Sequence, residues 1–393
     1  MRKKKIIFLS HSSNLFGAEA SLFTLAKTLD PGKYEKLVIC PGKGMLVEEL
    51  AKAGIPHMVI PMTNWVSPVS HWSRARLLNV SRLSNVLIAR EIKRVDRVVK
   101  EFDCEALVSN TVTINHGALI SAENGIPHIW YIHELLSEGS LWFDKISHVR
   151  KIIDFVVKNS DRLVFCSNIT YKAFIDNSDA KMAQVISEKK HILFPLSDPI
   201  PVPGPTEKSR GNEHRISVVG AISPYKGQMD VLEAFINIRK NIPGWVLEFA
   251  GPVINNRYYS ELKKTINKND MKKQVKFRGF QPDIYTYLSG VDILVVPSWV
   301  ETFGKTALDA MLSGVPVIIS KNSGICELLE DRINAVFIDI KSPVNISAAI
   351  MELVRDDQLR DTVRDNGYKR AVEISNIDLQ RIKFEEILIK SGV

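Results

Sequence analysis

The sequence predicts two α/β domains, each built on a doubly wound parallel β-sheet that helices cover on both faces. Short runs that are apolar throughout alternate with amphipathic helical stretches along the 393-residue chain. Strands that are buried on both faces have this uniformly apolar character. One segment rich in proline and polar residues interrupts the alternation and divides the chain into two halves.

In the first half, seven apolar runs predict strands and four amphipathic stretches predict helices. The basic residues 2–5 precede an apolar run that stops at Ser10, which is shorter than the roughly 7–15 residues of a signal peptide core. A short first strand is therefore expected there. The predicted strands are 5–10, 36–40, 57–61, 106–109, 128–132, 162–166 and 191–194, and the predicted helices are 18–29, 46–53, 87–102 and 145–159.

The interrupting segment, residues 199–214, is a linker by composition. It separates a domain of residues 1–198 from one of residues 215–375, and a final helical stretch, 376–393, can pack back on the first domain. In such sheets ligands bind beyond the carboxyl ends of the strands, where the strand order reverses, so two facing domains make a cleft. The second-half strands are 215–219, 245–250, 275–278, 293–296, 315–319 and 335–338, and the helices are 227–240, 258–269, 306–313 and 344–354.

Composition is that of an ordinary globular protein, with 45% hydrophobic and 24% charged residues. The net charge of +8 is compatible with anionic ligands, nucleic acid or an acidic membrane face and selects none of them. No stretch approaches the roughly 20 apolar residues of a membrane span. Because no RNA-binding signature or recognition-helix motif accompanies the charge, nucleic acid is not expected as a partner.

The cysteines and acids give no sign of a metal. Cys40, Cys104, Cys166 and Cys326 lie far apart, without the short spacing of a zinc or redox pair. Buried free thiols and a reducing cytoplasm are the expectation. No Asp-x-Asp occurs and no His/Cys cluster has ligand spacing, so no metal is expected.

The most informative segment covers residues 295–318. A buried strand ends there, a loop carries Glu301, and a helix begins near Gly304. Free backbone N–H groups and the positive end of the helix dipole favour a phosphate group, which a glycine allows to approach closely. Glu301 and Asp309 are spaced so that both can face one ligand, and carboxylates bind hydroxyl groups strongly. Taken singly, Glu301 as a helix cap and Asp309 as a solvated surface acid explain these residues as well.

A second strand, turn and helix start lies at residues 218–228. Lys226 stands at a helix N-terminus, where its charge opposes the dipole by about 0.3–1 kcal/mol. A lysine in this position indicates an anionic ligand.

Two residues follow strands of the first domain. His133 comes at the carboxyl end of strand 128–132, where it faces the ligand crevice. The alternative is a polar residue satisfied at a strand end. Gly17 lies between the first strand and the first helix, where a ligand-approaching loop and a plain tight turn explain it equally well.

Together these segments resemble the GT-B glycosyltransferases, specifically the large retaining family four. The resemblance spans most of the chain and is strongest over residues 215–320. It departs from the family pattern at Thr302, where glycine is usual, and at Asp309, where glutamate is usual. The matching residues are Glu301-Thr302-Phe303-Gly304, Asp309 and Gly314-Val315-Pro316-Val317.

The resemblance implies two Rossmann-like domains that face a cleft, the first binding the acceptor and the second a nucleotide-sugar. It implies that Glu301 holds the donor sugar, that Asp309 holds the ribose hydroxyls and that Lys226 clamps the diphosphate. The implied catalytic residues are Glu301, His133 and Lys226, and the implied donor-binding residues are Gly17, Gly220, Lys226, Gly279, Phe280, Glu301, Thr302, Phe303, Gly304, Lys305 and Asp309.

One expected residue is missing. The family places an arginine just after the strand's glycine, and Ala221 and Ile222 stand there instead. Lys305, at the start of the phosphate-facing helix, is the candidate substitute, and a solvent-exposed Lys305 is the alternative.

The implied function is a retaining, metal-independent hexosyltransferase without a cofactor. It would move a sugar to a glycan or lipid-linked acceptor in cell-surface polysaccharide or glycolipid synthesis. The alternatives are a nucleotide-sugar epimerase on the same fold and a degenerate nucleotide-binding member without turnover. A basic stretch over residues 74–100 predicts either contact with the inner face of the membrane or a solvated helix face, and a cytoplasmic location fits both.

Overall fold

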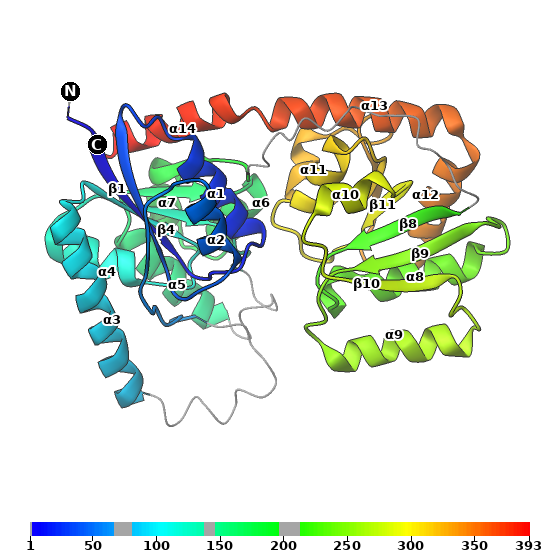
Figure 1. Cartoon of the computed structure of the whole chain (residues 1–393), viewed down its shortest axis with the longest axis horizontal. Coiled ribbons are helices and arrows are strands. Elements are labelled where there is room, and N and C mark those ends of the chain that lie inside the picture. The colour runs from blue at the N-terminus through cyan, green and yellow to red at the C-terminus, as the bar shows by residue number, and fades with distance from the viewer. Residues whose placement is uncertain (1, 67–80, 137–145, 196–212) are drawn as a thin grey trace. The chain divides into compact units, whose positions relative to one another are not determined.

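The computed structural model describes residues 2–66, 81–136, 146–195 and 213–393 (Figure 1). These residues form two compact units. The first unit comprises Met1–Asp198 together with Ile377–Val393, and the second comprises Pro199–Asn376. All but the last two residues of the predicted linker 199–214 lie outside the described residues.

The first unit contains a seven-stranded parallel sheet in the order β3-β2-β1-β4-β5-β6-β7. Every strand predicted for this half is present, with ends that differ by a residue or two. The bounds are β1 Lys4–Ser10, β2 Tyr34–Cys40, β3 His57–Val59, β4 Ala106–Asn110, β5 His128–Ile132, β6 Arg162–Phe165 and β7 Lys190–Ile192.

Helices cover both faces of this sheet, which explains why its strands are apolar throughout. Ile6 and Phe8 of β1 belong to a core that includes side chains of α1, α2 and α14. Ile7 and Leu9, which point the other way, belong to a core that includes side chains of α3 and α4. The helices are α1 Gly17–Thr28, α2 Met45–Lys52, α3 Ser81–Phe102, α4 His116–Asn124, α5 Ile146–Lys158, α6 Asn168–Asp176, α7 Ala180–Lys189 and α14 Ile377–Lys390.

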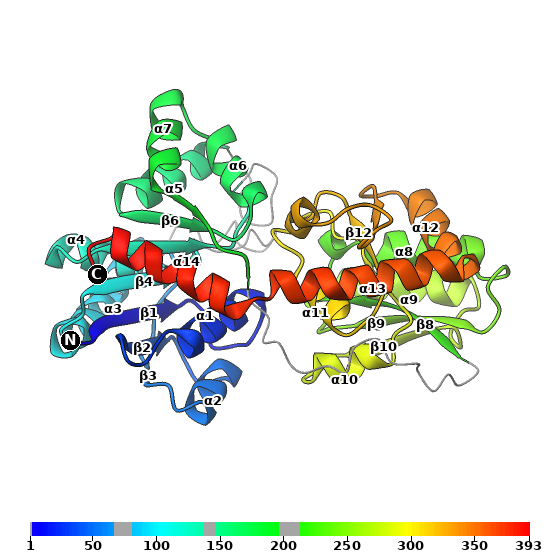
Figure 2. The same ribbon diagram turned by 90° about the horizontal axis from the view of Figure 1, so that it is seen from above.

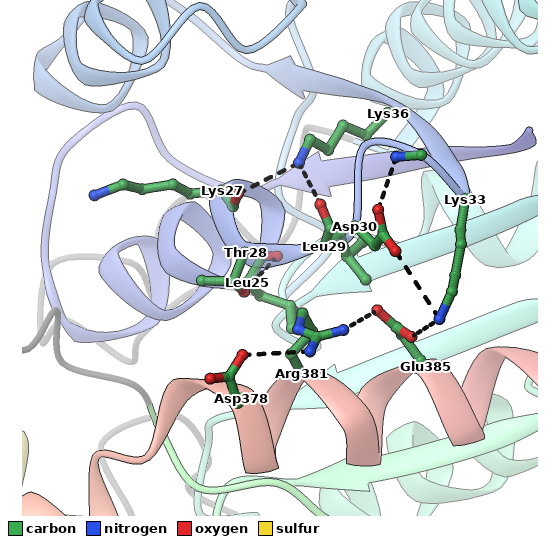
Figure 3. Close-up of polar contacts among 11 residues, drawn as sticks. Leu25, Lys27, Thr28, Leu29, Asp30, Lys33, Lys36, Asp378, Arg381 and Glu385 are labelled. Carbon is green, nitrogen blue, oxygen red and sulfur yellow. Dashed lines mark hydrogen bonds and ion pairs between the residues drawn. The ribbon is translucent and has the colours of Figure 1, made fainter.

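The C-terminal helix α14 is part of the first unit and runs beside α1 (Figure 2). Phe384 is fully buried, and its ring centre lies 6.1 Å from that of Phe8. Polar contacts join the same helix to the turn before β2 (Figure 3). Glu385 accepts from Arg381 of its own helix at 2.9 Å and from Lys33 at 3.2 Å.

The second unit contains a six-stranded parallel sheet in the order β10-β9-β8-β11-β12-β13. In Figure 1, α9 lies on one side of this sheet and α10 and α11 on the other. The strands are β8 His214–Val219, β9 Trp245–Ala250, β10 Val275–Gly279, β11 Ile293–Val296, β12 Val317–Ser320 and β13 Val336–Ile338. The helices are α8 Gln228–Ile238, α9 Asn256–Lys268, α10 Ile284–Ser289, α11 Lys305–Leu312, α12 Pro343–Arg355 and α13 Asp357–Ile374.

Among the helices of the described residues, five escaped the sequence patterns: α4, α6, α7, α10 and α13. Helix α13 is mostly polar and packs on α11 and α12, and its buried residues include the small Gly367 and Ala371. Helix α4 buries polar residues such as His116 and Ser121 alongside Ile120, so its sequence shows no clean apolar stripe. Both helices are held by tertiary packing rather than by a strong local pattern.

The cysteines are free, and Cys40, Cys104 and Cys166 are buried as predicted, whereas Cys326 is half-buried. Burial raises the pKa of the Cys40 thiol to about 12. Within the described parts of the chain, no helix combines the length and apolarity that crossing a bilayer requires.

Candidate active site

The second unit has its topological switch point between β8 and β11. The chain leads from β8 outward to β9 and β10 on one side, and from β11 to β12 and β13 on the other. In sheets of this order, the loops that follow the two central strands border the ligand crevice. These loops are residues 220–227 and 297–304, and they carry Lys226 and Glu301.

Lys226 and Glu301 meet at this edge. The Lys226 Nζ atom donates to Glu301 Oε2 at 2.6 Å, across 75 positions of sequence. The Lys226 side chain is 34% exposed and that of Glu301 is 16% exposed, so the pair is partly buried yet accessible to a ligand. A charge-assisted contact of this length fixes the positions of both side chains.

Two glycines let the Lys226 turn sit against its neighbours. Gly227 has a φ of 66°, and a Cβ atom there would lie 2.6 Å from the carbonyl oxygen of Pro297. Gly220 has a φ of 151°, and the aliphatic stem of Lys226 passes 3.7 Å from its ideal Cβ position. Only glycine satisfies both the backbone angle and the close approach at position 227.

The loop after β11 is anchored at both ends of the Glu301-Thr302-Phe303 stretch. Glu301 forms an isolated bridge with Ser323, and the N–H of Ile325 donates to the carbonyl of Phe303 at 2.6 Å. The Phe303 side chain is buried, and Thr302 is half-buried beside it. These contacts connect the Glu301 loop to the segment that follows β12.

Helix α11 follows with Gly304 as its N-cap residue, at a φ of 109°. Gly304 has no side chain with which to cap the helix, and the Glu301 carboxylate accepts a hydrogen bond from Lys226. The free N–H groups of the first turn, with the dipole of an eight-residue helix, favour an anion near Gly304 and Lys305.

Asp309 is buried, which rules out the interpretation of this residue as a solvated surface acid. Lys305 Nζ lies 2.9 Å from each of its carboxylate oxygens, and the Tyr285 hydroxyl donates to Oδ1 at 3.2 Å. Lys305, with 23% of its side chain exposed, is thus an ion-pair partner rather than a freely solvated lysine.

Gly279 ends β10, and Phe280 follows it at the start of the turn. Gly279 has a φ of 67° and open space around its Cβ position, and Phe280 is 42% exposed. Below the turn, the fully buried Glu248 accepts from Arg278 and from the Tyr287 hydroxyl. This network supports the turn from below, while Gly279 and Phe280 stay accessible at the surface.

The first unit reverses its strand order between β1 and β4, and a buried polar cluster lies after its central strands. His133, just beyond β5, binds the side-chain oxygen of Asn110 through Nε2 at 3.0 Å. His11, just beyond β1, lies 3.4 Å from the buried Glu19 of α1. Gly17 begins α1, and a Cβ atom there would meet nothing within 4 Å.

Loss of hydration lowers the pKa of His133 to about 3, with a smaller contribution from His11. Its imidazole is therefore neutral near pH 7. Burial raises the pKa of Glu134 to about 7, against hydrogen bonds from backbone N–H groups that include that of Val112. A neutral histidine beside a partly protonated carboxyl group suits a site that binds hydroxyl groups.

Several of these partners were not predicted from the sequence. His11 and Glu134 each come within a residue or two of the end of an apolar strand, and Asn110 ends one, so strand ends were the available signal. Tyr285 carries no local signal, since its role depends on where α10 packs. In the described part of the chain, no three His, Cys, Asp or Glu side chains gather as a metal site requires.

Comparison with known proteins finds similarity to glycosyltransferases. The family model described as glycosyl transferases group 1 matches residues 205–370. An uncharacterized glycosyltransferase of Methanocaldococcus jannaschii is 25% identical over 64% of this chain and 65% of its own length. A D-inositol 3-phosphate glycosyltransferase of Corynebacterium kroppenstedtii is 26% identical over 56% of this chain and 51% of its own. The chain thus spans about half to two thirds of the length of these curated relatives.

Solved structures show the same fold. HepE of Anabaena, crystallised with UDP and glucose, superposes with a TM-score of 0.81 at 22% identity, over 98% of this chain and 99% of that one. A sucrose-phosphate synthase of Thermosynechococcus elongatus superposes with a TM-score of 0.72 at 14% identity, over 98% and 99%. The predicted fold class, two Rossmann-like domains of the GT-B type, is confirmed.

Proposed function

We propose, on the premise that residues 205–370 belong to the glycosyl transferases group 1 family, that this protein transfers a sugar from a nucleotide-sugar donor to an acceptor hydroxyl. The observation that carries the proposal is the contact between Lys226 and Glu301 at the switch point of the second sheet. It joins a cation suited to a diphosphate and a carboxylate suited to sugar hydroxyls beside the N-terminus of α11.

The donor's diphosphate would bind to Lys226 and to the first N–H groups of α11. A lysine ammonium has three donors, so Lys226 can keep its contact with Glu301 and also bind a phosphate oxygen. The second oxygen of Glu301 is then available to a sugar hydroxyl. HepE structures contain UDP and UDP-glucose, which makes UDP-sugars the first donors to test.

The ribose would lie near Asp309. Asp309 already accepts from Lys305 and Tyr285, and each carboxylate oxygen has a second lone pair for a ribose hydroxyl. Lys305 sits one turn nearer the helix start, where its charge also favours the diphosphate. This supports Lys305 as the partial substitute for the arginine that Ala221 and Ile222 replace.

The chemical step would be metal-independent and retain the anomeric configuration. The acceptor oxygen forms a bond to the anomeric carbon while the bond from that carbon to the diphosphate oxygen breaks on the same face. The departing diphosphate takes the acceptor's proton. Lys226 and the N-terminus of α11 would stabilise the charge that develops on this leaving group.

A lipid-linked or other glycan acceptor, met at the inner face of a membrane, is the proposal for the first unit. Five basic residues of α3 are exposed at helical spacing: Arg90, Lys93, Arg94, Arg97 and Lys100. Such a stripe attracts anionic headgroups at about 1 kcal/mol per charge. A lipopolysaccharide core biosynthesis glycosyltransferase of Rhizobium meliloti is 26% identical over 39% of this chain, which supports an acceptor of this class. The remaining basic residues of the predicted stretch, Arg74, Arg76 and Arg82, lie outside the residues whose side chains are described.

Membrane contact is tested by co-sedimentation with vesicles that contain phosphatidylglycerol. Binding should be lost at high salt and in Arg94→Glu/Arg97→Glu, and it should persist in a control reversal on α9, Lys264→Glu/Lys268→Glu. Co-sedimentation that changes neither with salt nor in the α3 variant would refute the membrane contact. The proposal for the donor site would be unaffected by that result.

The function itself is tested by mass spectrometry of the full chain incubated with a panel of nucleotide-sugars and a lipid extract. Transfer or donor hydrolysis should appear in the wild type, vanish in Glu301→Gln and persist in Glu261→Gln, a surface acid of α9. Interconversion of the donor sugar without any acceptor would instead identify an epimerase. Nucleotide binding without turnover would identify a non-catalytic member.

A further inference from the structure

We infer that Trp299 is a positioning residue of this site, which ties the turn carrying Lys226 to the loop carrying Glu301. The inference rests on the proposed function, because it names the residue that sets the geometry of the same site. The backbone N–H of Trp299 donates to the carbonyl of Tyr225 at 2.8 Å. The two loops that border the switch point are thereby hydrogen-bonded one residue before Lys226 and two residues before Glu301.

The Trp299 side chain adds a second connection. Its indole Nε1 donates to Asp230 Oδ2 at 2.6 Å, and Asp230 lies in the first turn of α8, directly after the Lys226 turn. Burial raises the pKa of Asp230, while the indole N–H and the charge of Lys341 oppose that rise. The indole N–H of Trp299 and the charge of Lys341 thus favour the ionised form of the Asp230 carboxylate.

Lys341 completes the arrangement from a third segment of the chain. Its Nζ lies 4.3 Å from the centre of the Trp299 ring, within cation–π range. Lys341 has a φ of 53°, an unusual conformation for a residue other than glycine. The Tyr225 ring meets the indole edge-on, with centroids 6.2 Å apart. Segments from α8, from the Lys226 turn and from the loop after β13 therefore converge on one indole.

None of these contacts involves the ligand-facing atoms of Lys226 or Glu301. Trp299 acts on the pair through the spacing of the two loops, because the 2.6 Å contact between the Lys226 and Glu301 side chains requires these loops to keep a fixed separation. Without the indole N–H, the loop after β11 loses its side-chain hydrogen bond to α8, while the backbone bond to Tyr225 still joins the two loops. The expected result is a site that contains the right side chains at the wrong spacing.

The test compares Trp299→Phe and Asp230→Ala in the full chain, with Glu233→Ala, an exposed acid on α8, as the control. UDP affinity, measured by calorimetry well below every melting temperature, should fall about tenfold in Trp299→Phe and in Asp230→Ala. The double variant should bind UDP no more weakly than whichever single variant binds it less tightly, because both changes remove the same contact. A melting temperature that falls while UDP affinity stays at the wild-type value would mean a merely structural residue and would overturn the inference.

A second measurement does not depend on any nucleotide. The rate at which an amine-reactive reagent modifies Lys226, followed by peptide mass spectrometry, should rise several-fold in Trp299→Phe and remain unchanged in Glu233→Ala. An unchanged rate in Trp299→Phe would refute the positioning role even if UDP binds. If the wild type binds neither UDP nor any nucleotide-sugar of the panel, while modification of Lys226 is accelerated in Trp299→Phe, the proposed function is refuted and the positioning role of Trp299 stands.

Discussion

Lys226 Nζ and Glu301 Oε2 lie 2.6 Å apart although 75 positions separate them in the chain. Both residues precede a helix and follow a central strand of the same sheet, so the strand order brings their loops side by side. Each side chain balances the charge of the other in a half-buried setting. A diphosphate-sugar that binds there meets a cation and an acid already in register.

Substitution of either partner should show that the two act as one unit. Lys226→Met and Glu301→Gln should each lower kcat/KM by about a hundredfold or more, since each removes charge aimed at the donor. The double variant should lose little beyond the worse single variant. Steady-state kinetics measures this, with Lys264→Met on α9 as the control. Fully additive losses would contradict a shared role.

Gly227→Ala should be more damaging than its backbone angle alone explains. Gly54 has the same φ of 66° but open space around its Cβ position, whereas a Cβ at position 227 meets the Pro297 oxygen at 2.6 Å. Gly54→Ala should cost about 1–2 kcal/mol of unfolding free energy. Gly227→Ala should cost more and also abolish activity, because the Lys226 turn must move. Urea unfolding and kinetics compare the two, and equal costs would show that the collision relaxes freely.

The C-terminal helix should contribute strongly to the stability of the first unit. Phe384→Ala removes a fully buried ring from the core shared by β1, α1 and α14, and should cost about 3–5 kcal/mol. Ile389→Ala, on the same helix but 64% exposed, should change stability by less than about 0.5 kcal/mol. Thermal and urea unfolding provide the measurement. Similar effects of both changes would mean that α14 is not firmly packed.

Acid should destabilise the protein partly through His133. The pKa of His133 is about 3 in the folded state and 6.5 in its unperturbed state, so the folded state binds fewer protons between these values. Stability then falls as pH decreases from about 6.5 toward 3. His133→Gln should reduce the slope of the unfolding free energy against pH by the equivalent of up to about one bound proton.

Glu134 acts in the opposite sense over part of the same window. Its pKa is raised from 4.5 to about 7, so its contribution destabilises the fold as pH rises through that range. Glu134→Gln should therefore steepen the acid-side loss that His133→Gln flattens. Urea midpoints at successive pH values separate the two, and parallel curves for all three proteins would contradict both assignments.

Binding of UDP and of uridine should distinguish the role of Lys305 from that of Asp309. Lys305→Met removes a charge near the start of α11 and should weaken UDP binding far more than uridine binding. Asp309→Asn changes the proposed ribose contact and should weaken both ligands. Calorimetric titration with UDP and uridine decides this. Equal losses of both ligands in Lys305→Met would show that Lys305 serves only to hold Asp309.

The sequence by itself determined the two-unit α/β fold and the loops that carry the site. Uniformly apolar strands indicate a sheet buried on both faces, and the loop after a parallel strand is where ligands bind. Glu301 and Lys226 stand in such loops, so their positions followed from local pattern alone.

Only the tertiary structure decided which side chains meet. That β8 lies beside β11 is a long-range choice, and it alone brings Lys226 to Glu301. The contacts of Asp309 with Tyr285 and of Trp299 with Asp230 depend likewise on how helices pack on the sheet. Such partners are set by packing between distant segments, and no periodicity in a local stretch of sequence reveals them. The polar helix α13 escaped detection because it too is held by tertiary packing rather than by a local pattern.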